Sequence, residues 1–301
     1  MACSSPLLAV YKGLREDGKK KVQILTHVDD AGSIEDYRKK YEHFGHELML
    51  LPCGSCPSCL MKRRKEWAVR CEMEAREYKD NCFVTLTYDD EHLPDKLVKK
   101  DFQRFIKSLR NEGFTIRYFG CGEYGSKTGR PHYHVILFGF IPSDLKPFIK
   151  SDKGIWQFKS ELLTKLWNKG LVTVAEFSPE YAAYTAGYVE KKLGNKDCFT
   201  LMSTRPGIGR KYIEANLGKV YTYDNLVINY GSHQLGVPRY FDKVAESKGL
   251  YIEDIKEMRK ENARVTGANT MRQIGASSED DLLLYYQAVN KSSMIQRKRG
   301  L

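Results

Sequence analysis

Two histidines stand one residue apart at the head of an apolar run, in the stretch GRPHYHVILFG of residues 129–139. Side chains of a strand alternate between its two faces, so we expect His132 and His134 to project to the same face and Tyr133 to the other. Two imidazoles on one face are close enough to bind one ion. Histidines at a strand end are also often packed or surface groups, so the pair alone leaves that alternative open.

A carboxylate precedes the histidines at a spacing that suits a third ligand. Glu123 lies nine residues before His132, and a hairpin across residues 124–131 would bring it alongside. Two imidazoles and a carboxylate form a mixed nitrogen and oxygen site for a divalent ion, with Mn favoured by ligand type and Mg by cellular availability. Such a site leaves coordination positions open for a phosphate.

A metal that polarises a phosphate also needs a nucleophile, and tyrosines follow on a strongly punctuated helix. Tyr184 and Tyr188 are four residues apart and therefore share one helical face. Lys191, three residues past Tyr188, is placed to favour the phenolate or to bind the phosphate, and Lys192 adds a further positive charge. The alternative is that this tyrosine stripe, which begins at Tyr181, is ordinary helix core.

Three cysteines form a second group with metal-ligand spacing. Cys53, Cys56 and Cys59 stand in PCGSCPSCL, and the C-x2-C-x2-C spacing lets backbone turns direct several thiolates at one point. The sequence has no export signal, so its cysteines are expected to be thiols or ligands rather than disulfides. We expect a structural zinc with Cys3 as the fourth ligand and Cys71 as its rival. A reduced cysteine-rich turn without metal is the alternative.

The charge of the chain favours a polyanionic partner. Lys and Arg outnumber Asp and Glu by 49 to 38, which gives a formal net charge of +11. Directly after the cysteines comes a basic cluster that could follow a phosphate backbone or simply form a solvated helix face, namely Lys62, Arg63, Arg64 and Lys65. No apolar run approaches a membrane span, and the first residues are too short in apolar length for a signal peptide, so we expect a cytoplasmic protein.

The elements that must position these residues predict an α+β fold with a central antiparallel sheet and flanking helices, preceded by a small cysteine-rich, zinc-knuckle-like segment. Strand residues and turn residues indicate a hairpin in the middle of this order, and Ser178, Pro179 and Gly194 punctuate the last helix. The expected order is strand 82–90, helix 99–113, strands 115–125 and 132–140, helix 158–170, strand 171–177 and helix 178–194.

The remaining chain gives weaker signals. We expect irregular chain or short strands over residues 1–60, a basic helix at about 58–78, short strands near 219–230, and helices near 240–262 and 278–290. The predicted domains are residues 1–78 with the cysteines and basic helix, residues 79–215 as a catalytic core, and residues 216–301 as a C-terminal region of uncertain role.

Several of these motifs occur together in a known class of enzyme. FVTLTY at 83–88, RPHYHVILFG at 130–139 and YTAGYVEKK at 184–192 resemble, in that order, the motifs of the HUH endonucleases. Within this class the chain resembles the rolling-circle replication initiators of microviruses, especially the gokushovirus-like single-stranded DNA phages. GCGEYG at 120–125 resembles the segment that supplies the third metal ligand. Tyr between the two histidines, in place of a bulky aliphatic residue, is a mild departure.

The resemblance implies an HUH or RRM-like sheet with the metal on one face and the tyrosine helix across it. It implies that a tyrosyl oxygen attacks a phosphodiester of single-stranded or origin DNA, forms a 5′-phosphotyrosine link and frees a 3′ hydroxyl, after which the strand is rejoined. Lys191 favours Tyr188 for the first cut. The 3′ hydroxyl would prime a host polymerase in the bacterial cytoplasm, and a host helicase would unwind the DNA, since the chain has no G-x4-G-K-[ST] loop.

Two other kinds of protein fit part of the sequence. An HUH relaxase or a single-strand transposase would use the same residues on a different substrate. A non-catalytic zinc-knuckle regulator that binds DNA would account for the charge and the cysteines, but it would leave Glu123, the histidines and the tyrosine pair without a role. A barrel hydrolase with a His-x-His strand end is disfavoured, because the other histidines show no matching placement.

Overall fold

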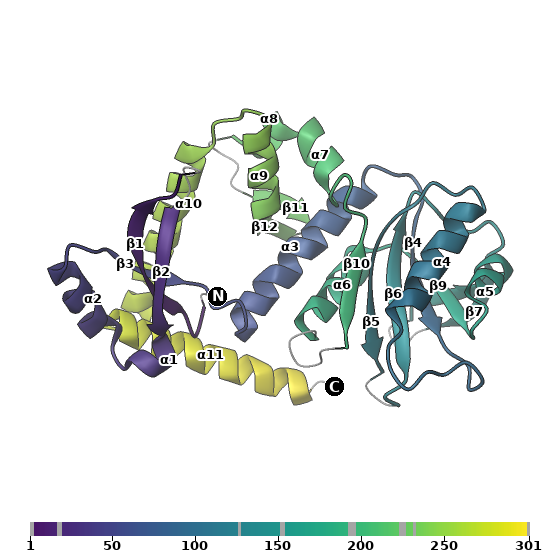
Figure 1. The fold of residues 1–301 in the computed structure, drawn as a ribbon, viewed down its shortest axis with the longest axis horizontal. Helices are drawn as coiled ribbons and strands as arrows, with labels where there is room; N and C mark the ends of the chain where they lie inside the picture. Colours follow the sequence, from purple (N-terminus) through teal and green to yellow (C-terminus); the bar gives the residue numbers. More distant parts are fainter. Residues whose placement is uncertain are drawn as a thin grey trace. The chain divides into compact units, whose positions relative to one another are not determined.

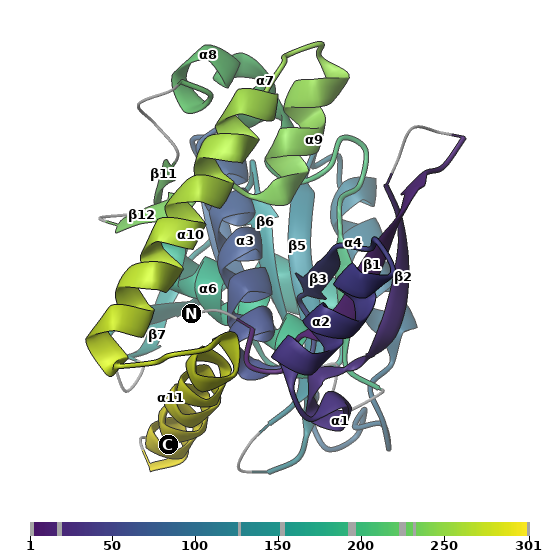
Figure 2. The same ribbon diagram turned by 90° about the vertical axis from the view of Figure 1, so that its left-hand side faces the viewer.

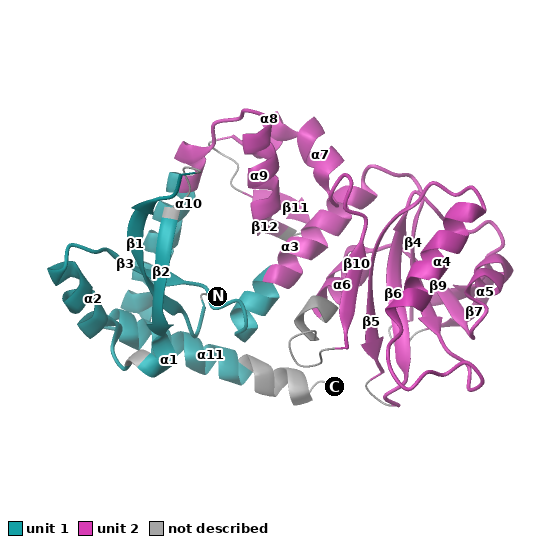
Figure 3. Cartoon of the chain, in the orientation of Figure 1, with its two compact units in different colours: residues 1–62, 257–301 teal, residues 63–256 magenta. Residues whose placement is uncertain are grey.

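The computed structural model of the chain describes residues 3–16, 20–125, 128–150, 154–191, 197–222, 227–230 and 233–299. Two compact units make up the chain. Residues 63–256 form one unit, and residues 1–62 together with 257–301 form the other (Figure 3). The three sequence-predicted domains stay a prediction, since the two units are defined by packing alone.

Unit 63–256 is built around a seven-stranded sheet in which every neighbouring pair is antiparallel. Its order is β10-β5-β6-β4-β9-β8-β7. This confirms the predicted α+β class with a central antiparallel sheet. The strands are β4 Asn81–Thr87, β5 Arg117–Tyr124, β6 Pro131–Phe138, β7 Lys146–Lys150, β8 Trp156–Lys159, β9 Val172–Glu176 and β10 Phe199–Met202.

Helices α4 (Lys99–Asn111) and α5 (Glu161–Trp167) cover one face of this sheet (Figure 1). The apolar stripe of α4 packs on Val84, Tyr133 and Val135, which point to that face. Helix α5 is shorter than predicted, because Ser160 caps its N-terminus by accepting from Leu163 N at 3.1 Å and residues 158–159 belong to β8. The burial of the stripe of α4 is complete at Phe102, Phe105, Ile106 and Leu109.

Helices α3 (Pro57–Ala75) and α6 (Pro179–Lys191) cover the opposite face, as Figures 1 and 2 show. Phe83, Phe119 and Ile136 from three neighbouring strands pack there against Cys71 of α3 and Ala182 of α6. The central strands are therefore buried on both faces, which explains their nearly continuous apolar sequence.

A second core in the same unit joins α3 to the segment after the sheet. Val69 and Met73 of α3 pack against Ile213, Phe241 and Val244. The predicted helix at 240–262 is wrong, because the chain turns at Gly249, whose φ of +79° disfavours other residues, and two helices lie on either side. The elements are α7 Arg210–Ala215, α8 Leu217–Val220, β11 Val227–Tyr230, β12 His233–Gly236, α9 Arg239–Ser247 and α10 Glu253–Ile274.

The other unit joins the first residues of the chain to the last. Its antiparallel sheet has the order β2-β1-β3, and Leu8, Val10, Ile34 and Leu48 form its core with Leu283. The Asp280 carboxylate accepts from Ser33 Oγ and Ile34 N, both at 3.0 Å. The elements are β1 Leu7–Leu14, β2 Lys20–His27, α1 Val28–Ala31, α2 Ile34–His43, β3 Leu48–Leu51 and α11 Glu279–Arg299, with the adjoining parts of α3 and α10.

Most predicted elements of the sheet unit lie where we expected them. Strand 82–90 ends early at Thr87, and helix 178–194 is described from Pro179 to Lys191. Gly194, its expected stop, lies outside the described residues. None of the helices in the described part of the chain is long and apolar enough to cross a membrane.

Candidate active site

The hairpin of β5 and β6 brings the three predicted metal ligands to one place. Glu123 lies directly opposite His132, and His134 lies opposite Cys121 on the same face. Glu123 Oε1 is 3.0 Å from His132 Nε2 and 3.3 Å from His134 Nε2. The register therefore directs one carboxylate oxygen and two imidazole nitrogens at a common point.

Burial makes this group suited to a cation. Glu123 is only 3% exposed and His134 only 5%, and a carboxylate held this far from water needs a positive partner. One ligand atom from each of the three residues lies within 4.8 Å of the others. The structure thus has a cluster able to hold a metal ion, with the nitrogen and oxygen donors that suit Mg or Mn.

The backbone and a threonine orient the imidazoles. His132 Nδ1 lies 3.2 Å from the carbonyl oxygen of Arg130; a carbonyl only accepts, so Nδ1 carries the proton and Nε2 is left for the metal. His134 Nδ1 lies 3.0 Å from Thr85 Oγ1, on the residue that pairs with His134 across β4 and β6. Sequence reasoning missed Thr85, although the period of two in FVTLTY places it on the face of the histidines.

Tyr184 is the tyrosine that lies against this cluster. Its ring stands edge-on to His134 with the centroids 5.2 Å apart, and its side chain is 43% exposed. Tyr181 instead stacks on Phe83 at 4.2 Å, and burial raises the pKa of its hydroxyl. Tyr184 therefore combines solvent access with proximity to the metal ligands, whereas Tyr181 belongs mainly to the core.

Helix α6 is held over the sheet by its cap and by an arginine of α3. Ser178 Oγ accepts from Tyr181 N at 3.4 Å, and Arg64 Nε donates to the carbonyl oxygen of Ala183 at 2.8 Å. A Cβ at Gly187 would lie 3.3 Å from the Arg64 guanidinium. Arg64, expected from the sequence to bind DNA, thus contacts the tyrosine helix.

The other predicted DNA-binding residues have different places. Lys62, Arg63 and Lys65 are exposed on α3. The backbone of Tyr188 and Lys191 continues α6, but their side chains lie outside the described part of the structure, as does the whole of Lys192.

Tyr133, between the two histidines, serves the opposite face. Its side chain is fully buried, and its hydroxyl lies 2.6 Å from the Tyr88 hydroxyl. Val98 N, at the start of α4, donates to the same hydroxyl at 3.1 Å. A tyrosine at this position therefore joins β6 to α4, a function that an aliphatic residue lacks.

The four cysteines form a second cluster, in the other unit. Cys3 Sγ lies 3.6 Å from Cys53 Sγ and 3.7 Å from Cys56 Sγ, and all four sulfurs, with Cys59, lie within 4.8 Å of one another. The first residues thus fold back to the C-x2-C-x2-C turn. Cys71, the rival ligand, is instead fully buried in the core of the sheet unit.

Hydrogen bonds divide these thiols into two kinds. Burial opposes ionisation of Cys56, but N–H donors of Cys59 and Ser4 outweigh it and bring the pKa to about 6. Burial raises the pKa of Cys3 and of Cys59. The cluster therefore includes a thiol already disposed to be a thiolate, the form that binds metal.

Comparisons with known proteins match both the sheet unit and the longer chain. A family model described as replication-associated protein ORF2 matches residues 81–193, from β4 to just past α6. The replication-associated protein ORF2 of Spiroplasma virus 4 is 37% identical over 239 residues, which are 72% of this chain and 75% of that protein. No solved structure matches.

Two further phage proteins show similar identity. The replication-associated protein VP4 of Bdellovibrio phage phiMH2K is 37% identical over 207 residues, 63% of this chain and 65% of its own. The replication-associated protein ORF4 of Chlamydia phage 1 is 35% identical over 210 residues, which are 64% of this chain and 52% of that protein.

Proposed function

Because the chain belongs to the ORF2 family of microvirus-type replication-associated proteins, we propose that it initiates rolling-circle replication by nicking origin DNA. The observation that carries this proposal is the contact between Tyr184 and the Glu123, His132 and His134 cluster. A nucleophile beside an open metal site is the arrangement that phosphodiester transfer requires. A protein that only bound DNA would have no use for it.

A Mg or Mn ion held by the cluster would polarise the scissile phosphodiester. The Tyr184 hydroxyl loses its proton and its oxygen attacks the phosphorus, the bond to the 3′ oxygen breaks, and that oxygen takes up a proton. The 5′ end stays on the tyrosine and a 3′ hydroxyl is released. Since a phosphodiester is exchanged for a phosphotyrosine, the energy of the bond is kept for rejoining the strand.

Two tyrosines allow repeated cutting. Tyr188 follows Tyr184 by one helical turn, about 6 Å along the axis. While one phenol holds the old 5′ end, the other can cut the regenerated origin. Lys191 favours Tyr188 for the first cut, whereas the described geometry gives a place only to Tyr184, so the order of use is decided by experiment.

The remaining parts of the proposal concern binding. Lys62, Arg63, Arg64, Lys65 and Lys192 would contact the phosphates of single-stranded origin DNA. A host polymerase would extend the 3′ hydroxyl and a host helicase would unwind the duplex, in the cytoplasm of the host bacterium. At the other cluster we propose a structural zinc held by Cys3, Cys53, Cys56 and Cys59, because four thiolates suit Zn rather than Mg.

Labelled single-stranded origin DNA, resolved on a denaturing gel with peptide mapping of the adduct, tests this proposal. We expect a protein-linked strand that needs Mg or Mn, is absent in His134→Ala and is absent in the Tyr184→Phe, Tyr188→Phe double variant. Each single tyrosine variant should still cut once but should not release closed circles. Tyr181→Phe is the matched control, since Tyr181 packs on Phe83, and should behave as wild type.

The alternatives give different results in the same assay. A zinc-knuckle regulator would bind the DNA without forming an adduct. A relaxase or single-strand transposase would form an adduct but would prefer transfer origins or transposon ends to a phage origin. An adduct on Tyr181, or one that persists in the double variant, would contradict the assignment of the nucleophiles.

A further inference from the structure

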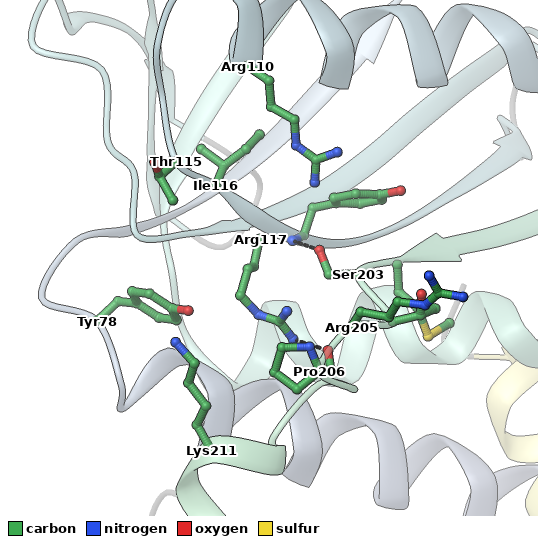
Figure 4. Close-up of a pocket in the computed structure, with 12 residues that line it drawn as sticks. Tyr78, Arg110, Thr115, Ile116, Arg117, Ser203, Arg205, Pro206 and Lys211 are labelled. Carbon is green, nitrogen blue, oxygen red and sulfur yellow. Dashed lines mark hydrogen bonds between the residues drawn. The ribbon is translucent and has the colours of Figure 1, made fainter.

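A basic pocket opens at the far end of β5 from Glu123. It is formed by the first residues of β5, the last turn of α4, the chain after β10, the loop after α3 and the start of α7 (Figure 4). Its volume is about 640 Å³, within the ~300–1,000 Å³ typical of ligand pockets. We call it the β5 pocket; Tyr78, Arg110, Arg117, Tyr118, Arg205 and Lys211 line it.

The β5 pocket carries an excess of positive charge. Arg117 is committed to the structure, because it pairs with the buried Glu74 carboxylate and donates to the carbonyl oxygen of Pro206 at 2.7 Å. Arg110, Arg205 and Lys211 are exposed, and no ion pair joins any of these three to a carboxylate among the residues that the structure describes. None of the described lining residues is acidic. The pocket therefore favours an anion.

Aromatic rings lie beside two of these cations. The Arg110 guanidinium lies 5.7 Å from the centre of the Tyr118 ring, and Lys211 Nζ lies 5.9 Å from the centre of the Tyr78 ring. In Figure 4, Arg110 reaches in from α4, and Tyr78 and Lys211 lie across the pocket from it. A cation beside a ring suits a nucleotide, whose base stacks on the aromatic or guanidinium plane while its phosphate meets the charge.

The walls of the pocket are fixed before any ligand binds. Tyr118 N donates to Ser203 Oγ at 3.1 Å, and Ser203 N donates to the carbonyl oxygen of Tyr118 at 2.9 Å. The Glu74 carboxylate also accepts from Gly209 N at 2.6 Å, which holds the start of α7. A site that is already ordered loses less conformational entropy on binding.

We propose that the β5 pocket binds one nucleotide of the DNA strand, at a distance from the cleavage site. This inference rests on the proposed function, which brings a single strand to Glu123. Six residues of β5 separate Arg117 from Glu123, about 20 Å along an extended strand. At the ~3.4 Å spacing of stacked nucleotides this is about six nucleotides. The pocket would thus hold a base and phosphate well outside the scissile step and lengthen the footprint.

Fluorescence anisotropy with single-stranded oligonucleotides of increasing length tests the pocket. One series extends to the 5′ side of the nick site and the other to the 3′ side. The pocket variant is Arg110→Gln with Lys211→Gln, both exposed. The control is Lys107→Gln with Lys165→Gln, which removes the same charge from exposed positions of α4 and α5 that do not line the pocket.

We expect wild-type affinity to rise in a step when one series reaches about six nucleotides from the nick. The pocket variant should lack that step, bind long strands about tenfold more weakly at low salt, and lower the slope of log K against log salt by about 1.4. The control variant should keep the step. Equal losses in both variants, or a loss that is the same for short and long strands, would overturn the proposal.

A separate readout keeps this result apart from the nicking hypothesis. Adduct formation on a short oligonucleotide that ends before the β5 pocket should be the same in wild type and the pocket variant. If the wild type forms no adduct on any strand, the proposed function fails, while the length-dependent step in binding still decides whether the pocket takes a nucleotide.

Discussion

Each histidine of the metal cluster presents Nε2 to Glu123 because its other nitrogen is already engaged. Arg130 supplies a backbone oxygen to His132, and Thr85 supplies a hydroxyl to His134. The first contact comes with the hairpin and needs no particular side chain. The second depends on one residue of a neighbouring strand, so Thr85 is a positioning residue for the metal ligand.

Replacing Thr85 by Val removes the hydroxyl and keeps the branched shape. We expect affinity for Mn to fall by about 10- to 100-fold, the usual effect of losing a partner that orients a ligating histidine. Titration of Mn followed by electron paramagnetic resonance measures this directly, without DNA. Thr85→Ser restores the oxygen and should recover most of the affinity. Unchanged Mn binding in Thr85→Val would show that the hydroxyl does not position His134.

At this scale the sequence was informative where periodicity and a hairpin were sufficient. Alternation along a strand grouped His132 with His134, and a nine-residue separation brought Glu123 opposite. The same alternation includes Thr85, but the pairing of β4 with β6 crosses nearly 50 residues of chain and is invisible locally. Helical spacing alone also could not separate Tyr181 from Tyr184, because only the packing of Phe83 distinguishes them.

At the scale of elements, β6 connects chemistry on one face to stability on the other. His132 and His134 point to the metal cluster, while Tyr133 contacts Tyr88 and the start of α4. A strand fixed in this way cannot shift its register without moving every ligand to the wrong face. The residue that departs from the usual motif therefore contributes to the precision of the site from behind.

Replacing Tyr133 by Phe tests this division. Removing its hydroxyl leaves the Val98 N–H and the Tyr88 hydroxyl without this partner in a buried place, so the free energy of unfolding should fall by about 1–3 kcal/mol. Urea denaturation measures that loss. Mn affinity and adduct formation, per folded molecule, should remain as in wild type. A variant of full stability that has lost Mn affinity would place Tyr133 in the metal site instead.

Element prediction succeeded for long periodic segments and failed for short or edge ones. The order of β4, α4, β5, β6, α5, β9 and α6 agrees with the sequence-based order. β7, β8 and β10 were missed, because four- or five-residue strands gain their stability from a neighbour rather than from their own pattern. Gly249 divides the predicted helix at 240–262 in the same way: its neighbours are helix-forming, and only the backbone conformation shows the break.

At the scale of the whole molecule, the ends of the chain share one unit. Arg38 of α2 pairs with Glu279 at 2.6 Å, and Ser58 Oγ donates to Asn290 at 2.7 Å in a buried contact. Pairs separated by more than 230 residues carry no local signal, so the sequence could not join the N-terminal segment to α11. The predicted separation of residues 1–78 from residues 216–301 reflects that lack of signal.

The cysteine cluster gives this unit a dependence on metal and on pH that the sheet unit should not share. Chelation of zinc should lower the melting temperature of residues 1–62 with 257–301, because binding free energy at a structural site is folding free energy. Cys3 and Cys59, with raised pKa values, carry protons at pH 7, so zinc uptake should release them.

The direction of the pH dependence follows from Cys56. Its folded pKa of about 6 lies below the ordinary 9.0, so in the metal-free cluster its contribution to stability is fully present above the unfolded value and is lost as pH falls through about 6. Protons compete with zinc over the same range, and zinc should therefore dissociate as pH falls below about 6. A colorimetric chelator follows the release, and calorimetry in buffers of different ionisation enthalpy counts the protons.

Two alanine variants decide the ligand set. Cys3→Ala should lower zinc content and shift release to higher pH, whereas Cys71→Ala should keep about one zinc per chain even if it weakens the core in which Cys71 is buried. Mn binding at Glu123, His132 and His134 serves as the internal control, since those residues belong to the other unit. Full zinc content in Cys3→Ala, or zinc loss only in Cys71→Ala, would mean that the N-terminal arm does not close the site.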